Sequence, residues 1–226
     1  IDKPTVDWIE KFYNETWDVN TKKTAADVIT FSHSVVVDIL GELNVDKDAS
    51  VFDIGAGYGQ LLKQLSDDGY TNLHGSEHSP HRAQVATEYS GALVSHTPFH
   101  TDNINELKKQ GPFKVMYSKS VMEHVYDPNE LFQTTAALQE DGDYLIILVP
   151  NTEREAFLNV ALFFPHLHSF SRQSLVELGK RYGYVTKEVR EYGSGIILVA
   201  QKGGASTDLS YPVVSLSETT KRWDAE

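Results

Sequence analysis

The stretch VFDIGAGYGQ, residues 51–60, decides the fold. An apolar run that favours a strand leads into glycines at 55, 57 and 59, and LLKQL then begins a helical pattern. Glycine has no Cβ, so it permits positive φ values and lets a ligand approach the backbone closely. Between a strand and a helix, such a turn also directs N–H groups toward a bound ligand. The stretch therefore predicts a ligand-binding turn at the end of a sheet strand.

Strand and helix patterns alternate from residue 49 onward. Runs such as DYLIILVP (143–150) are continuously apolar, as in strands covered on both faces. The pattern predicts an α/β fold with a doubly wound, mostly parallel seven-stranded sheet. Only YGSG (192–195) separates the last two strands, so the final strand should enter antiparallel, through a hairpin. Strands are expected at 50–54, 72–76, about 92–96, 113–118, 143–149, 183–190 and 195–201, and helices beginning near 58, 80, 103, 129 and 171.

Two segments flank this alternating region, residues 49–202. Residues 1–48 predict an N-terminal helical cap. A first helix is expected over VDWIEKFYNETWDV (6–19), and a second runs through AADVITFSHSVVVDILGEL (25–43). Residues 203–226 are rich in Ser and Thr and predict a polar C-terminal extension.

Composition narrows the class of protein. The 226 residues include no cysteine, which excludes disulfides, cysteine-ligated zinc and thiolate catalysis. No apolar run approaches the roughly 20 residues of a membrane helix, and the charged, aromatic N-terminus does not resemble a secretory signal. A cytoplasmic protein is therefore expected. The net charge of −12 repels nucleic acid, so a small-molecule substrate is favoured.

Two acidic residues indicate the class of ligand. A dinucleotide turn of the form G-x-G-x-x-G would require glycine at position 60, which is Gln60. Asp53, just before the turn, can serve a bound amino group. Glu77 ends the second expected strand, where a carboxylate can hold both ribose hydroxyls. Glu77 suits NAD and S-adenosylmethionine equally, but together with Asp53 and Gln60 it favours a nucleoside that carries an amino acid.

The order of motifs resembles the class I S-adenosylmethionine-dependent methyltransferases, in the small-molecule group of ubiquinone-biosynthesis O-methyltransferases and sugar methyltransferases. The resemblance covers roughly residues 49–202 and implies a Rossmann-like methyltransferase domain. The matching segments are VFDIGAGYGQLL (51–62), GSEHSPHRAQVA (75–86), FKVMYSKSVMEHVYDPNELF (113–132), LQEDGDYLIILVPN (138–151) and HLHSFSRQSLVELGKRYGYV (166–185).

The resemblance implies a role for particular positions in binding S-adenosylmethionine and its product S-adenosylhomocysteine. The turn would pass under the methionine part, with Asp53 near the amino group, and Glu77 would hold the ribose. The residues expected to bind the cofactor are Asp53, Gly55, Ala56, Gly57, Gly59, Glu77, His78, Asp102, Asn103, Ser118 and Lys119.

Histidines are the candidates for catalysis, because a hydroxyl acceptor usually requires a base and imidazole titrates near neutral pH. His124 follows the fourth expected strand, while His166 and His168 alternate on a segment expected to cover the substrate. Each could instead be structural. Glu123 could be a structural or an acceptor-positioning carboxylate. The apolar stretch NVALFFPHLH (159–168) could line a substrate pocket or form a homodimer contact.

Several alternatives stay open at this stage. The acceptor atom is expected to be oxygen, but nitrogen or carbon is not excluded, and neither is a non-catalytic cofactor-binding subunit. An NAD-dependent oxidoreductase or epimerase is disfavoured by Gln60, by the hairpin and by the lack of a Tyr-x-x-x-Lys pair. No metal is expected, because a histidine-rich rim explains the remaining histidines more simply; these are His74, His78, His81, His96 and His100.

Overall fold

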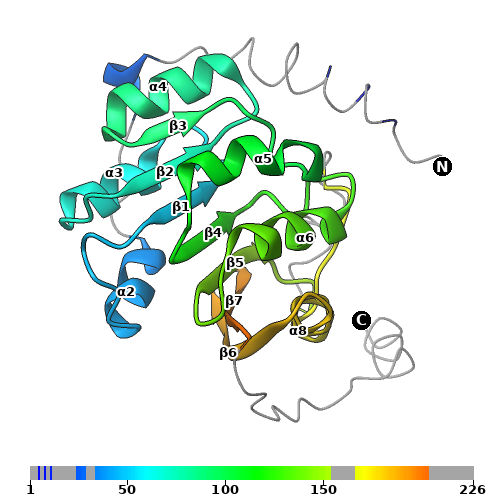
Figure 1. Ribbon diagram of the computed structural model, residues 1–226. Helices are drawn as coiled ribbons and strands as arrows, with labels where there is room; N and C mark the ends of the chain where they lie inside the picture. The colour runs from blue at the N-terminus through cyan, green and yellow to red at the C-terminus, as the bar shows by residue number, and fades with distance from the viewer. Residues whose placement is uncertain are drawn as a thin grey trace.

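The computed structural model describes residues 24–28, 34–153 and 166–203, together with Thr5, Trp8 and Lys11 (Figure 1). Most of the expected first helix (6–19), residues 159–165 of the apolar stretch 159–168 and the expected extension beyond residue 203 lie outside the described residues. No helix in these ranges has the length and apolar character needed to cross a bilayer.

A seven-stranded sheet in the order β3-β2-β1-β4-β5-β7-β6 forms the centre of the molecule. The first five strands are parallel, and β7 runs antiparallel to both β5 and β6. This confirms the predicted sheet and its antiparallel last strand, and every strand boundary lies within two residues of its predicted position. The strands are β1 (Val51–Ile54), β2 (Leu73–Ser76), β3 (Leu93–Ser95), β4 (Val115–Lys119), β5 (Tyr144–Pro150), β6 (Tyr184–Tyr192) and β7 (Gly195–Lys202).

Helices cover both faces of the sheet (Figure 1). Side chains of α2 and α3 pack on one face and those of α5, α6 and α8 on the other, while α4 packs against α3 and β3. The helices are α2 (Val35–Glu42), α3 (Gln60–Asp67), α4 (Pro80–Ser90), α5 (Ile104–Leu107), α6 (Pro128–Leu138) and α8 (Arg172–Arg181), with 3₁₀ turns η2 (Ala25–Asp27), η3 (Thr101–Asn103) and η4 (Lys108–Gln110).

Alternation along β1 divides the core into two clusters. Phe52 and Ile54 point toward the α6 face, where they join Phe132, whereas Val51 points toward the α2 face, where it joins Ile39. Successive side chains of a strand point to opposite faces, so a central strand covered on both sides must be apolar throughout. Asp53 is the polar exception in β1, and it is only 4% exposed.

The expected single helix through residues 25–43 is wrong. A 3₁₀ turn covers Ala25–Asp27 and ends at Val28, whose backbone is extended, and α2 begins only at Val35. Ser34 is also extended and accepts a hydrogen bond from Val36 N, as an N-cap residue does. The apolar spacing in this segment was compatible with a helix, but α2 begins only after its Ser34 cap, at Val35, ten residues after the start of η2.

Helix α2 is an integral layer of the fold. Its apolar side chains lie in the same core cluster as β1, β4 and β5, although the sequence suggested a separate cap for residues 1–48. The division into a cap, a domain at 49–202 and an extension stays a prediction. The α2 residues in this cluster are Val35, Val36, Ile39 and Leu40.

Candidate functional site

The turn between β1 and α3 contains three glycines with positive φ and three different surroundings. A Cβ on Gly55 (φ +78°) would lie 2.5 Å from Val121 Cγ2, and one on Gly59 (φ +76°) would lie 2.8 Å from Ala86 O. A Cβ on Gly57 (φ +56°) would meet nothing within 4 Å. The missing side chain at Gly55 therefore makes room for the loop after β4, and the one at Gly59 makes room for α4. Gly57 has no such protein neighbour, so it is the point where a ligand can approach the turn.

Glu77 lies across this open point. Its carboxylate accepts hydrogen bonds from Gly57 N at 2.8 Å and from Ser79 N at 3.1 Å. Ser79 caps α4, so the acid joins the glycine turn to the beginning of the next helix. The side chain thus lies at the carboxyl ends of β1 and β2, where an open α/β sheet binds its ligands.

Three further amides of the turn donate to protein carbonyls. Gly55 N and Ala56 N both donate to Ser76 O at 2.9 Å, and Gly59 N donates to Ala56 O. An anionic ligand such as a pyrophosphate would have to displace the Glu77 carboxylate from Gly57 N. The charges at the turn therefore favour a ligand with cationic or hydroxyl groups.

Asp53 lies below the turn and is paired with a tyrosine. Tyr117 Oη donates to Asp53 Oδ2 at 2.8 Å, and both side chains are buried. Burial raises the pKa of Asp53 to about 7, although the Tyr117 hydrogen bond and the charge of Lys119 lower it and the charge of Glu77 raises it. Burial and the nearby Asp53 hold the pKa of Tyr117 well above its usual range. A bound ammonium group would stabilise the ionised form of Asp53.

Polar residues just before and within the first turn of α4 border the glycine turn. His78 directly follows Glu77 and is exposed, and its place against the adenine stays a prediction. The Arg82 guanidinium lies 5.2 Å from the ring centroid of Tyr58, a residue of the turn itself. These contacts fix the turn against the start of α4.

Asp102 and Asn103 lie in η3, which is attached to α6. His100 Nδ1 accepts a hydrogen bond from Asp102 N, and His100 Nε2 is 2.8 Å from Glu130 of α6. Asn103 Nδ2 donates to Pro98 O at 3.1 Å. These contacts anchor the segment after β3, and the role of both residues in binding adenine stays a prediction.

The end of β4 turns sharply toward the glycines. Ser118 is fully buried, and its Oγ has no hydrogen-bond partner among the described residues. Lys119 is exposed, and Ser120 has a φ of +54°, which is uncommon for a residue other than glycine. This bend brings Val121 against Gly55. Backbone strain of this kind concentrates at functional sites.

Glu123, His124 and His166, the Glu-His-His cluster, come together just beyond this bend. His124 N donates to Val121 O at 2.9 Å, which places the cluster next to the glycine turn. His124 Nε2 is 3.8 Å from Glu123 Oε1, and the rings of His124 and His166 are 4.8 Å apart. The structure thus joins two of the three candidate catalytic histidines, which are 42 positions apart in the sequence.

Glu123 organises this region through its backbone and its side chain. Its carbonyl accepts hydrogen bonds from Leu167 N at 2.8 Å and His168 N at 3.1 Å. Its carboxylate is 2% exposed, and burial raises its pKa to about 7. His168, the third candidate, points elsewhere, with Nε2 3.2 Å from Tyr126 O.

The idea of a rim that includes His74 is wrong. His74 lies within β2, with its ring against Phe113 and Nε2 2.8 Å from Asn72 Oδ1. Burial lowers the pKa of His74, which favours the neutral ring. Its strand position and the register of β2 with β1 explain the burial. His100 is likewise held by Glu130.

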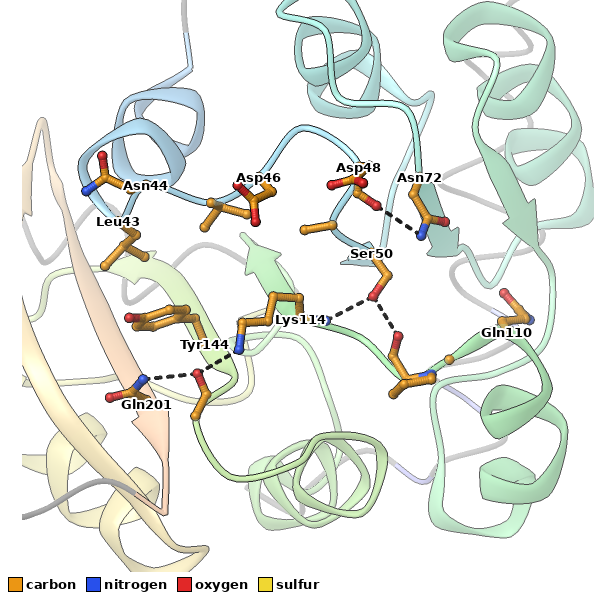
Figure 2. Close-up of a pocket in the computed structure, with 15 residues that line it drawn as sticks. Leu43, Asn44, Asp46, Asp48, Ser50, Asn72, Gln110, Lys114, Tyr144 and Gln201 are labelled. Atoms are coloured by element: carbon orange, nitrogen blue, oxygen red, sulfur yellow. Dashed lines mark hydrogen bonds between the residues drawn. The ribbon is translucent and has the colours of Figure 1, made fainter.

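A groove of about 860 Å³ lies at the opposite ends of the strands (Figure 2). Its polar groups bond to one another: Ser50 Oγ donates to Pro112 O at 2.6 Å, and Lys114 Nζ and Gln201 Nε2 both donate to Gly142 O. The groove is lined by the residues that precede β1, β4 and β5. Parallel α/β sheets bind ligands at the other end, so we place the functional site at the glycine turn.

Sequence reasoning missed Tyr117 and left Glu123 unassigned. Tyr117 looked like one more apolar position of β4, and only the register of β1 with β4 places it opposite Asp53. Glu123 carried no signal for burial, although an acid directly before a candidate histidine could have drawn attention to it.

The comparisons with known proteins agree with a methyltransferase fold. A family model described as a methyltransferase domain matches residues 34–189. The chain is 29% identical to the ubiquinone biosynthesis O-methyltransferase of Caulobacter sp. strain K31 over 108 residues, which are 47% of this chain and 42% of that protein. The match therefore spans less than half the length of that curated relative.

Solved structures share the fold. Magnesium protoporphyrin IX methyltransferase from Synechocystis PCC 6803 with bound S-adenosylhomocysteine has a TM-score of 0.65 at 13% identity, covering 86% of this chain and 98% of that one. The same enzyme with bound S-adenosylmethionine has a TM-score of 0.60 at 12% identity, covering 89% and 100%. Because the family model matches well over half of the 226 residues, the chain belongs to the class I S-adenosylmethionine-dependent methyltransferases.

Proposed function

We propose that this protein binds S-adenosylmethionine at the glycine turn and transfers its methyl group to a hydroxyl of a small molecule. The observation that carries the proposal is the carboxylate of Glu77 at the open point of the turn, bonded to Gly57 N. A ribose diol can bind to this carboxylate from the open side, since each of its oxygens has a further lone pair.

Electrostatics support this cofactor. Asp53 and Glu77 place two carboxyl groups at the turn, and S-adenosylmethionine carries an ammonium and a sulfonium. The cofactor ammonium would stabilise the ionised form of Asp53, whose pKa burial raises to about 7. A pyrophosphate would gain no such stabilisation and would be repelled by Glu77.

The Glu-His-His cluster supports oxygen as the acceptor atom. Methyl transfer is an in-line displacement in which the acceptor oxygen attacks the methyl carbon as the carbon–sulfur bond breaks, and the electron pair of that bond stays on sulfur. The protein mainly aligns the two reactants and excludes water. A hydroxyl must also lose its proton, and the cluster provides the groups for this beside the turn. The curated Caulobacter relative is named as an O-methyltransferase.

The acceptor is expected to be a small molecule without a polyphosphate backbone. The net charge of −12 would repel such a backbone. A homodimer and a cytoplasmic location stay predictions from the sequence.

A labelled methyl group tests the proposal. The protein is incubated with S-adenosylmethionine labelled in its methyl group and with matched sets of hydroxyl, amine and carbon acceptors. Label is expected in a hydroxyl product, and His124→Ala should lower turnover much more than cofactor affinity. Label confined to amines or carbon would overturn oxygen as the acceptor. Cofactor binding without transfer to any acceptor would favour a non-catalytic subunit.

A further inference from the structure

The Glu-His-His cluster has the composition and spacing of a metal site. Glu123, His124 and His166 each offer a ligand atom within 4.8 Å of the other two. Two imidazoles and one carboxylate are a common ligand set of zinc and non-haem iron. Ligand atoms around a bound ion are about 3–3.5 Å apart, given bonds of about 2.0–2.2 Å, so the 3.8 Å between His124 Nε2 and Glu123 Oε1 requires only a small adjustment.

The backbone holds the cluster together from two distant segments. The bend after β4 supplies Glu123 and His124, and the segment before α8 supplies His166. The Glu123 carbonyl accepts two hydrogen bonds from that second segment, at Leu167 N and His168 N. This segment is also anchored at Phe170, which pairs with Asn151 at the end of β5. The three side chains are therefore positioned by the fold.

The buried carboxylate of Glu123 gives a second, independent indication. The side chain is 2% exposed, and Oε2 has no hydrogen-bond partner in the part of the chain that the structure describes. A buried ionised carboxylate whose charge is only partly compensated costs several kcal/mol. At the cluster, His124 Nε2 lies 3.8 Å from Glu123 Oε1, and the ring of His124 contacts that of His166. A cation at the cluster would compensate this carboxylate.

We propose that Glu123, His124 and His166 bind a divalent transition metal ion of the kind that prefers imidazole, such as Zn²⁺. Mg²⁺ and Ca²⁺ are disfavoured, because they prefer oxygen ligands. Three protein ligands leave a coordination position open, as in catalytic zinc sites. The sequence predicted no metal because it weighed five other histidines and could not bring His166 to Glu123.

The role of the ion rests on the proposed function, whereas its binding does not. A hydroxyl bound at the open position would release its proton to solvent at a lower pH than when free. Its oxygen would then form the bond to the methyl carbon, with the electron pair of the broken carbon–sulfur bond remaining on the sulfur of S-adenosylhomocysteine. The ion would be neither oxidised nor reduced.

Metal titration without cofactor or acceptor tests the site. The full chain is freed of metal with a chelator and titrated with Co²⁺, whose visible absorption reports imidazole ligation, and with Zn²⁺ by calorimetry. One ion per chain is expected. Glu123→Gln and His166→Ala should each weaken binding at least about tenfold, a loss that even outer-shell changes can cause. His168→Ala is the matched control and should leave metal affinity unchanged, because its ring contacts Tyr126 O.

The outcomes separate this proposal from the proposed function. Absence of a bound ion in the wild type, or equal affinity in Glu123→Gln and His166→Ala, overturns the metal site. Because Glu123 is buried, circular dichroism checks the fold of each variant, and the partly exposed His166 provides the test if Glu123→Gln does not fold. Binding of S-adenosylhomocysteine to the metal-free protein is measured in parallel. If the protein binds S-adenosylhomocysteine but no metal ion, the proposed cofactor stands and only the metal site is overturned.

Discussion

Tyr117 on β4 donates a hydrogen bond of 2.8 Å to Asp53 on β1, directly beneath the glycine turn. The two residues are opposite one another in the register of the two strands and point to the same face of the sheet. Because burial raises the pKa of Asp53 to about 7 and the Tyr117 hydrogen bond lowers it, this pair controls how much of the carboxylate is ionised near neutral pH.

Tyr117→Phe should weaken cofactor binding in a pH-dependent manner. Loss of the hydroxyl removes a hydrogen bond to the ionised carboxylate, so the pKa of Asp53 rises further and less carboxylate is available for an ammonium at pH 7. A charged hydrogen bond is worth about 1.5–3 kcal/mol, so we expect affinity for S-adenosylhomocysteine to fall about tenfold or more at pH 7 and less at pH 8.5.

Tyr184→Phe is the matched control for this change. Tyr184 is similarly buried, and its hydroxyl donates to Gln139 Oε1 at 2.7 Å, away from the glycine turn. Its loss should lower stability but not cofactor affinity. Equal cofactor affinity in Tyr117→Phe and the wild type at pH 7 would show that Asp53 does not contact the cofactor.

Asp53→Asn should change how stability depends on pH. The folded protein holds a proton on Asp53 up to about pH 7, whereas the unfolded chain releases it near pH 4. The folded state therefore binds more protons within this window, and the free energy of unfolding falls as the pH rises from about 4 to about 7. The loss is at most about 4 kcal/mol, at about 1.36 kcal/mol per pH unit.

Urea unfolding at pH 5 and pH 8 measures this effect. Between pH 5 and pH 8, the free energy of unfolding of Asp53→Asn should fall by about 1–3 kcal/mol less than that of the wild type, which is within the limit set by the raised pKa of Asp53. Asp46→Asn, at an exposed position, should follow the wild type. Identical pH slopes for Asp53→Asn and the wild type would contradict a raised pKa at Asp53. Burial also raises the pKa of Glu123 to about 7, so part of the pH dependence of the free energy of unfolding should remain in both proteins.

Gly57→Ala should separate ligand approach from backbone strain. A Cβ at Gly57 meets no protein atom within 4 Å, so the cost to folding is the positive φ alone, about 1–2 kcal/mol. Gly193→Ala has nearly the same φ, +57° against +56°, and equally open space, but lies in the turn between β6 and β7. Both variants should lose similar stability in thermal unfolding.

Cofactor affinity should distinguish these two glycine variants. Only Gly57→Ala places a methyl group where the ligand is expected, so its affinity for S-adenosylhomocysteine should fall at least about tenfold, while Gly193→Ala should bind like the wild type. Gly59→Ala should instead lose more stability than either, since its Cβ would lie 2.8 Å from the backbone oxygen of Ala86. Unchanged affinity in Gly57→Ala would move the ligand away from the turn.

Local patterns in the sequence were sufficient to predict the sheet. A continuous apolar run such as 144–150 indicates a strand that is covered on both faces, and the short YGSG connection requires the last two strands to be antiparallel. Both signals lie within a few neighbouring residues of the sequence. The sequence also predicted that Asp53 and Glu77 lie at the same edge of the sheet, because the carboxyl ends of parallel strands meet at that edge. These features depend on chain neighbours and on general topology.

Contacts between distant residues were out of reach. Tyr117 is 64 positions from Asp53, and its role depends on strand register. His166 lies beside His124 in a segment before α8 that bonds to the Glu123 carbonyl. His74 looked like a rim residue until the position of Phe113 was known. One sequence contains no signal for such pairings, since many registers satisfy the same apolar pattern.

Calorimetric titration of S-adenosylhomocysteine and of NAD into the wild type, Glu77→Gln and Glu106→Gln tests the central claim most directly. We expect the wild type to bind S-adenosylhomocysteine more tightly than NAD. Glu77→Gln should lose at least about tenfold in that affinity, because a charged hydrogen bond is worth about 1.5–3 kcal/mol. The exposed Glu106→Gln should bind like the wild type. Tighter binding of NAD, or equal affinity in Glu77→Gln and Glu106→Gln, would contradict a ribose held by Glu77 over the open glycine.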